Sequence, residues 1–219
     1  MRKYRIELHS HTSEVSPCGK ITAQEMIELY VQKGYNGIVI TDHFSGPLFS
    51  DLEDIGDILA RFCKGYKNAL LAAQDRIKVY LGAEVRLDES YNDYLVYGDV
   101  LRLLRHGKEL CKLSLQEFYY LAKEYDLAVF QAHPFRDHMK LDPKEFVDGI
   151  EVYNLHTEHD SRNYKAVDYA RKLNLLGISG TDCHKVHHAG RGGIFTDFLP
   201  VNEKELKDLI LSKSFDLIF

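Results

Sequence analysis

The sequence lacks the features that mark membrane, secreted and nucleic-acid-binding proteins. No apolar run approaches the ~20 residues of a membrane span, and no apolar signal segment precedes the first expected strand. The four cysteines show no CxxC spacing and suggest no disulfide framework. The formal net charge is −5 and no basic stripe is present, so nothing indicates nonspecific attraction to nucleic acid, and we expect no membrane as a partner. We therefore expect a protein of the reducing cytoplasm.

The chain also lacks linkers, internal repeats and low-complexity segments. Its 219 residues are enough for one sizeable core, and 45% hydrophobic with 28% charged residues is ordinary for a globular protein. We therefore expect a single domain over residues 1–219. What the chain has in excess is histidine: eleven are present, and most stand where apolar runs end.

Short apolar runs and helical patterns alternate about seven times along the chain. The expected strands cover residues 6–11, 37–41, 77–81, 94–97, 127–132, 149–153 and 175–179. The expected helices cover about 22–34, 51–73, 114–125, 160–173 and 202–211, and two of them begin at the capping boxes Thr22–Glu25 and Ser114–Glu117. Such alternation predicts an α/β fold built on parallel strands.

These strands are apolar on both faces, which favours a closed barrel over an open sheet. The complete eight-unit barrel typically needs ~250 residues. We therefore expect a distorted (β/α)7 TIM-like barrel, with a doubly wound open sheet as the alternative.

Nearly every expected strand ends in a residue able to bind a metal ion. These residues are His9, His11, Asp42, His43, Glu84, Asp99, His133, Asp182 and His184. Each alone has an ordinary interpretation: His133 as a core histidine, Glu84 as a salt-bridge partner, Asp182 as a turn cap. However, the carboxyl ends of barrel strands meet at one rim, where such barrels carry their active sites. The coincidence of all these residues at that rim predicts a metal centre.

The types of side chain at this rim indicate which metals to expect. Imidazole and carboxylate together suit Zn²⁺, Mn²⁺ or Fe²⁺ better than Ca²⁺ or Mg²⁺. Seven or more ligands exceed the needs of one tetrahedral ion, so we expect two or three divalent ions. Paired ions can clamp a phosphoryl group and generate hydroxide for in-line attack.

Five motifs, in this order, carry a family resemblance: His9-Ser-His11, Thr41-Asp42-His43, Gly82-Ala83-Glu84, Ala132-His133-Pro134 and Thr181-Asp182-Cys183-His184. Together they resemble the PHP domain, the polymerase and histidinol phosphatase family, over essentially the whole chain. The resemblance implies a distorted (β/α)7 barrel with up to three metal ions that acts on phosphate esters. It implies a first metal on His9, His11, Glu84 and Asp182, a second shared by Glu84 and His133, and a third on His43 and His184.

Two positions depart from the family pattern. The family usually has histidine or aspartate before the glycine of the first loop, and Cys18 stands there, with Glu14 in the same loop as the other candidate ligand. A Cys18 thiolate would favour zinc or iron, whereas the alternative is a small buried side chain. Where histidinol-phosphatase-type members carry another histidine, this chain has Asp99, which either binds the second metal or begins the next helix.

A phosphate ester needs cations to receive its charge. Arg136 and Arg191 are the best placed, with Arg86 and Arg162 weaker candidates, and we assign catalytic roles to Asp182 and His184 together with Arg136 and Arg191. The backbone amides of Gly190, Gly192 and Gly193 could also approach an anion.

The strand that carries Glu151 leads to a further set of candidates. Glu151 is expected to orient a ligand histidine. His156, near Glu158 and His159, either contacts substrate and protonates a leaving alkoxide or belongs to a solvated rim. The pair His187-His188 has no assigned role.

We expect this chain to hydrolyse a phosphate ester, most simply a phosphorylated small molecule, through a metal-activated hydroxide. A phosphodiesterase or exonuclease acting on nucleotides or short oligonucleotides is one alternative, and a non-catalytic metal-binding module is another. The sequence leaves the physiological substrate and the oligomeric state open.

Overall fold

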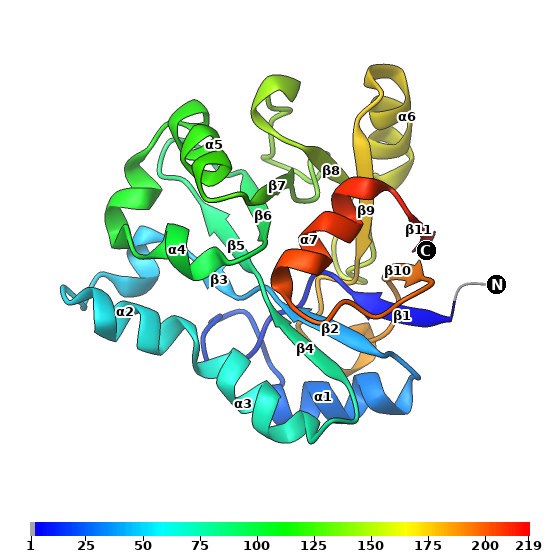
Figure 1. Cartoon of the computed structure of the whole chain (residues 1–219). Coiled ribbons are helices and arrows are strands. Elements are labelled where there is room, and N and C mark those ends of the chain that lie inside the picture. The colour runs from blue at the N-terminus through cyan, green and yellow to red at the C-terminus, as the bar shows by residue number, and fades with distance from the viewer. Residues whose placement is uncertain (1–2) are drawn as a thin grey trace.

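The computed structural model describes residues 3–219, whose strands form two sheets. The five-stranded sheet has the order β11 (Phe215–Ile218), β10 (Gly193–Thr196), β1 (Tyr4–Glu7), β2 (Gly37–Ile40), β4 (Lys78–Leu81). The six-stranded sheet has the order β3 (His43–Phe44), β5 (Ala83–Arg86), β6 (Asp93–Tyr97), β7 (Ala128–Gln131), β8 (Gly149–Asn154), β9 (Leu176–Gly180). Figure 1 shows these strands at the centre of the molecule with the helices around them.

The two sheets join into one distorted barrel. β2 runs on into β3 across Thr41 and Asp42, and only Gly82 separates β4 from β5. On the other side, a parallel bridge between Ser10 and Cys183 connects the chain beyond β1 with the chain beyond β9. The barrel wall therefore has seven strand positions: β1, β2/β3, β4/β5, β6, β7, β8 and β9. This confirms the expected distorted barrel over the open-sheet alternative.

The expectation that all strands run parallel is wrong for β6. This strand is antiparallel to both neighbours, β5 and β7. The reason is the short connection of residues 87–92, because a parallel crossover needs a dozen or more residues. The amino end of β6 therefore lies at the same rim as the carboxyl ends of β5 and β7.

The helices cover the outside of the barrel and one of its ends. They are α1 (Ala23–Gln32), α2 (Ile55–Phe62), α3 (Lys64–Ala73), α4 (Val100–Leu104), α5 (Leu115–Glu124), α6 (Asn163–Leu173) and α7 (Glu203–Ser212), with 3-10 turns η1 (Gly46–Phe49), η2 (Gly107–Lys112), η3 (Lys144–Phe146) and η4 (Val186–His188). Both capping boxes are present, at the starts of α1 and α5. Instead of the single helix expected over 51–73 there are two helices, α2 and α3, with Cys63 between them. None of the helices in residues 3–219 is long and apolar enough to cross a bilayer.

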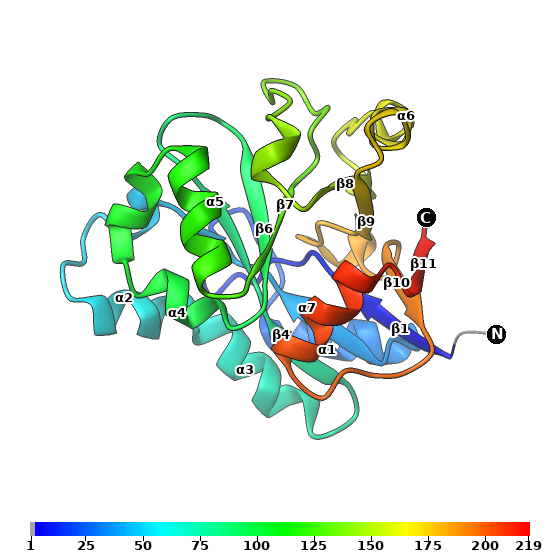
Figure 2. The same ribbon diagram turned by 45° about the horizontal axis from the view of Figure 1, so that its top comes forward.

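The barrel interior is a continuous apolar core. Inward side chains such as Ile6, Tyr80 and Phe130 pack against Leu206 and Ile210 of α7. Figures 1 and 2 show α7, in red, lying across the strands. Since α7 covers one end of the barrel with apolar side chains, we expect polar side chains at the opposite rim.

Candidate metal centre

The segment that follows β1 brings two imidazoles together at this rim. The Nε2 atoms of His9 and His11 lie 3.0 Å apart, and neither side chain is exposed to solvent. His9 Nδ1 is 2.9 Å from Glu151 Oε1, and His11 Nδ1 is 3.4 Å from Ser16 Oγ. Glu151 can only accept, and Ser16 Oγ already donates its proton to Asp42, so both Nδ1 atoms carry hydrogen. When both rings are neutral, as metal ligands must be, the two Nε2 atoms therefore face each other with lone pairs.

Two carboxylates close around these lone pairs. Glu84 Oε1 is 3.3 Å from His9 Nε2, and Glu84 Oε2 is 3.3 Å from His11 Nε2. Asp182 Oδ1 lies 3.5 Å from His9 Nε2 and 3.3 Å from His11 Nε2. With neutral rings, five acceptor atoms, two imidazole nitrogens and three carboxylate oxygens, thus converge in a buried space. A divalent cation satisfies such a set, so the residues fit the metal that the sequence predicts.

Glu84, on β5, lies at the centre of the cluster. Its Oε2 is 2.8 Å from His43 Nδ1, and its Oε1 is 3.2 Å from His133 Nε2. Burial opposes ionisation of Glu84, but the charges of His43, His9 and His11 outweigh it and hold the pKa of this carboxyl well below its usual value. Because each oxygen faces different imidazoles, Glu84 has the arrangement needed to bridge two ions.

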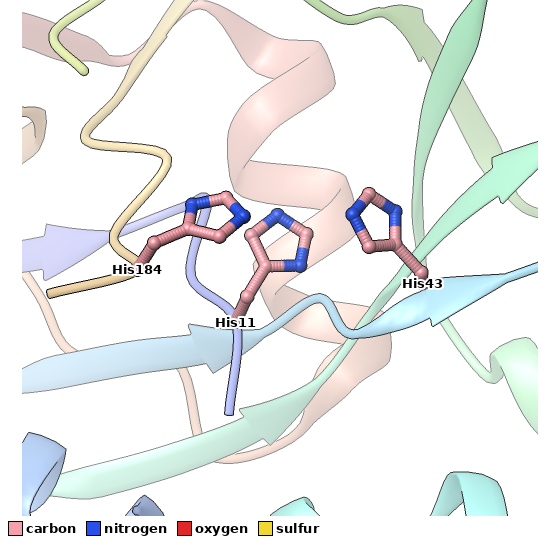
Figure 3. Close-up of side chains that lie close together, drawn as sticks. All are labelled: His11, His43 and His184. Atoms are coloured by element: carbon pink, nitrogen blue, oxygen red, sulfur yellow. The ribbon is translucent and has the colours of Figure 1, made fainter. Parts of the chain in front are cut away.

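A third group of candidate ligands, which includes His43 and His184, lies beside His11. Figure 3 shows the rings of His11, His43 and His184 side by side, and one nitrogen from each lies within 4.8 Å of the others. His184 Nδ1 donates to the backbone oxygen of Asp182 (2.9 Å), which leaves Nε2 to face Cys18 Sγ at 3.1 Å. Partial removal from water raises the pKa of the Cys18 thiol, but hydrogen bonds with His184 and His43 lower it to about 6. Cys18, not Glu14, stands at this subsite.

Asp93, the first residue of β6, is a candidate ligand that sequence reasoning missed. Its Oδ2 lies 3.9 Å from His133 Nε2, and its carboxylate groups with His43 and Glu84. Arg86 holds it through two hydrogen bonds, of 2.8 and 2.7 Å. The sequence does contain a signal for it. The connection of residues 87–92 is too short for a parallel crossover, so the two strands must form a hairpin, and the first residue of the second strand then lies at the metal rim.

The structure contradicts the ligand roles expected of Asp99 and Glu14. Asp99 is exposed at the far end of β6, because that strand is antiparallel. Both oxygens of Glu14 accept from the backbone N–H of Ala23, and one also accepts from Asn68, so this side chain caps α1 instead.

Of the two arginines assigned to phosphate, only Arg136 reaches the site. Its Nη2 donates to Asp182 Oδ2 (2.8 Å) and Asn154 Oδ1 (2.7 Å), and its buried Nε has no partner among the described residues. Arg191 is exposed, donates to the backbone of His187 and is not among the residues that line the cavity above the ligands, so the structure does not bring it to the site. The glycine loop does not offer amides either, since Gly192 and Gly193 donate to Thr181 and Ser179.

Further side chains next to the cluster hold its ligands in position or lie at its edge. Glu151 Oε2 accepts from the backbone N–H of His133 (3.0 Å), while its Oε1 holds His9. His133 and Asp182 have positive φ angles of 29° and 53°, a strained conformation for residues other than glycine, and one that concentrates at functional sites. His156 is only 8% exposed, and its Nδ1 accepts from the backbone N–H of Glu158 at 3.1 Å.

A cavity of about 370 Å³ opens directly above these ligands. The ligand residues that line it are Cys18, His43, Glu84, Asp93, His133, Asp182 and His184, and the positively charged ones are Lys20, Arg86, Arg136 and Lys185. His156, His159 and Glu158 also line it. Arg162 donates instead to Phe135 and Asp137. The cavity thus combines a carboxylate and imidazole floor with a cationic wall, which suits an anionic ligand held over metal ions.

Comparison with known proteins agrees with this geometry. The model of the PHP domain family matches residues 7–212. No curated protein matches the chain significantly. Among solved structures, PsfC from Pseudomonas syringae is similar with a TM-score of 0.72 at 16% identity, covering 100% of this chain and 92% of PsfC.

Two larger proteins contain a similar unit. A two-domain protein with a predicted PHP-like metal-dependent phosphoesterase, from Bacteroides vulgatus, has a TM-score of 0.71 at 16% identity, and the match covers 99% of this chain and 64% of that one. The lesion-specific endonuclease EndoQ from Pyrococcus furiosus has a TM-score of 0.68 at 16% identity, with coverage of 98% and 57%. At this identity the three structures show a shared fold.

Proposed function

Because this chain belongs to the PHP domain family, we propose that it is a metal-dependent phosphoesterase acting on a small phosphomonoester. The observation that carries the proposal is the buried convergence of His9 Nε2, His11 Nε2, Glu84 and Asp182 beneath a cationic cavity. The structures from Bacteroides vulgatus and Bifidobacterium adolescentis, whose descriptions assign a metal-dependent phosphoesterase activity by prediction only, support the reaction class.

The side chains present divide among three subsites. His9, His11, Glu84 and Asp182 would hold one ion, and Glu84, His133 and Asp93 a second. His43, His184 and Cys18, beside His11, would hold a third. Divalent ions bound there would polarise the phosphoryl group and lower the pKa of water to near neutrality.

The protein's own groups would bind and orient the ester. Arg136 has a buried Nε–H without a partner, and its Nη2 is fixed by Asp182 and Asn154, so its free donor has a defined direction. Lys20 adds positive charge at the cavity wall, whereas Lys185 is paired there with Glu158 at 2.7 Å. Such preorganised donors favour a group that gains negative charge as the reaction proceeds.

His156 adds a neutral donor to the same wall. Burial is the main cause that lowers its pKa, to about 3, so the ring is uncharged at neutral pH. Since Nδ1 accepts from Glu158 N–H, the ring proton lies on Nε2. His156 therefore supplies a hydrogen bond to the substrate and no positive charge.

The alternative is hydrolysis of a phosphodiester, and its support is the likeness to EndoQ, a lesion-specific endonuclease. Several cations around one cavity suit the two charges of a monoester better than the single charge of a diester. The net charge of −5 also disfavours a nucleic-acid backbone.

The test compares p-nitrophenyl phosphate with bis(p-nitrophenyl) phosphate, using protein stripped by a chelator and then reloaded with Mn²⁺ or Zn²⁺. We expect hydrolysis of the monoester only after reloading, and a loss of at least about 100-fold in turnover with lower metal content in Asp182→Asn. The matched control is Asp168→Asn, which changes an exposed carboxylate of α6. Full turnover by verified metal-free protein contradicts the proposal, and preference for the diester supports the alternative. Metal uptake without turnover on either ester indicates a binding module.

A further inference from the structure

A second cavity adjoins the one above the metal centre. It has a volume of about 360 Å³, within the size range of small-molecule sites. Its lining residues are Pro17, His43, Ser45, Pro47, Leu48 and Arg86. Two of these, His43 and Arg86, also line the metal cavity, so the two cavities are neighbours that share these side chains.

The lining of this second cavity differs in chemistry from that of the metal cavity. Pro17, Pro47 and Leu48 present hydrocarbon surfaces, and none of the lining side chains is acidic. The hydroxyl of Ser45 makes no capping hydrogen bond to η1. A phosphoryl group gains nothing from such a wall, because it offers few donors, whereas an apolar group loses its contact with water there.

The apolar wall is held in place by the core beneath it. Leu48 packs against the cluster that includes Phe49 and Phe62, and Phe49 is fully buried. The Phe44 and Phe49 rings lie 5.0 Å apart between centroids. Arg61 pairs with Asp51 at 2.7 Å, which ties the end of this turn to α2. The cavity is therefore already formed without a ligand, and binding requires little ordering.

The planar guanidinium of Arg86 forms one edge of the cavity. Its Nε and Nη2 both bond to Asp93, at 2.8 and 2.7 Å, and these two bonds fix the plane of the guanidinium. A guanidinium held in its own plane still offers its faces, which stack on aromatic rings. Proline rings and a guanidinium face together suit a planar aromatic group better than a flexible polar chain.

We propose that this second cavity binds the alcohol portion of the phosphate ester, and that this portion is a planar aromatic group. The proposal rests on the proposed function, since it needs the phosphoryl group to lie over the metal centre. The shared residues His43 and Arg86 place the second cavity next to that position. The aromatic group then packs against Pro17, Pro47 and Leu48 with Arg86 at its edge.

The test measures binding of phosphonates, because they contain no ester bond and leaving-group reactivity plays no part. Calorimetry on Mn²⁺-loaded protein compares 1-naphthylmethylphosphonate with ethylphosphonate. We expect the naphthyl compound to bind at least about tenfold more tightly, since its extra apolar surface is removed from water. Ser45→Phe, which fills the cavity, should remove this advantage, and Leu48→Ala should reduce it about fivefold.

The control is Leu71→Ala, which removes a leucine that is 77% exposed on α3, and it should leave both dissociation constants unchanged. Equal binding of the two phosphonates, or a naphthyl preference that survives Ser45→Phe, overturns the assignment of the second cavity alone. Failure of both phosphonates to bind, with no hydrolysis of p-nitrophenyl phosphate, overturns the proposed function and this assignment with it.

Discussion

At the scale of single residues, the ring nitrogen that carries the proton decides whether His9 and His11 can bind a metal ion. His9 and His11 each direct Nδ1 to a fixed acceptor, Glu151 and Ser16. This leaves two Nε2 lone pairs 3.0 Å apart, an arrangement that repels unless a cation lies between them or one ring takes a proton. The hydrogen-bond partners behind the rings are therefore as important to metal binding as the rings themselves.

The same reasoning predicts unusual reactivity for Cys18. Hydrogen bonds from His184 and His43 lower its pKa to about 6, so in metal-free protein the thiol loses its proton as pH rises through about 6. Because the thiolate is the nucleophile, alkylation by iodoacetamide should reach half its maximal rate near that pH, and loading with Zn²⁺ should suppress it. Mass spectrometry after timed quenching measures the modified fraction at each pH.

The other cysteines of the chain provide the comparison. Cys63, Cys111 and Cys183 are buried, and burial raises the pKa of Cys111 to about 12, so they should stay unmodified in folded protein. A Cys18 profile centred near pH 9, or a rate that Zn²⁺ leaves unchanged, contradicts the contact of this thiolate with the histidines.

At the scale of elements, the direction of β6 selects which aspartate meets the metals. The antiparallel strand brings Asp93 to the rim beside His133 and carries Asp99 to the opposite end. A parallel β6 would have done the reverse. One strand direction thus changes the ligand set without changing any residue.

This strand direction leads to a paired prediction. Asp93→Asn should weaken the binding of one metal equivalent by about 10- to 100-fold, because the carboxylate that faces His133 loses its charge. Asp99→Asn, the matched control, should leave all equivalents unchanged because its side chain is exposed on the far side. Calorimetric titration with Zn²⁺ measures both. An effect of Asp99→Asn equal to that of Asp93→Asn contradicts the strand assignment.

At the scale of the whole molecule, the metal centre collects ligands from nearly the entire barrel. His11 and His184 are separated by most of the chain, yet their ring centroids lie 4.4 Å apart. Glu84 and Asp182 are buried beside imidazoles that must be neutral to bind a metal, so cations bound there would stabilise these carboxylates, and they would bind the folded chain in preference to the unfolded one. We therefore expect metal binding and folding to be coupled.

Metal removal should consequently lower the melting temperature. With free Zn²⁺ at about 100 times the dissociation constant, each bound ion adds about 2.7 kcal/mol, which corresponds to a rise of roughly 5–10 °C for a chain of this size. Differential scanning calorimetry before and after chelation measures the change. The same Zn²⁺ addition to Glu84→Gln should give a much smaller rise, and an equal rise in this variant contradicts the central position of Glu84.

Much of the fold and the site could be predicted from the sequence alone. Apolar runs that end in His9, His11, His43, Glu84, His133, Asp182 and His184 predict both the strands and the chemistry of their ends, because the order of residues along each strand is local information. The two capping boxes are local in the same way, and the structure confirms both.

Only the tertiary structure decided among candidates that are equivalent along the chain. It placed Asp93 rather than Asp99, Cys18 rather than Glu14, and Arg136 rather than Arg191 at the metal rim. Each choice depends on a long-range pairing: β6 with β7, the first loop with His184, or the turn after β7 with Asp182. Local propensity does not determine which distant segment a loop or strand meets, since that depends on how the whole barrel closes.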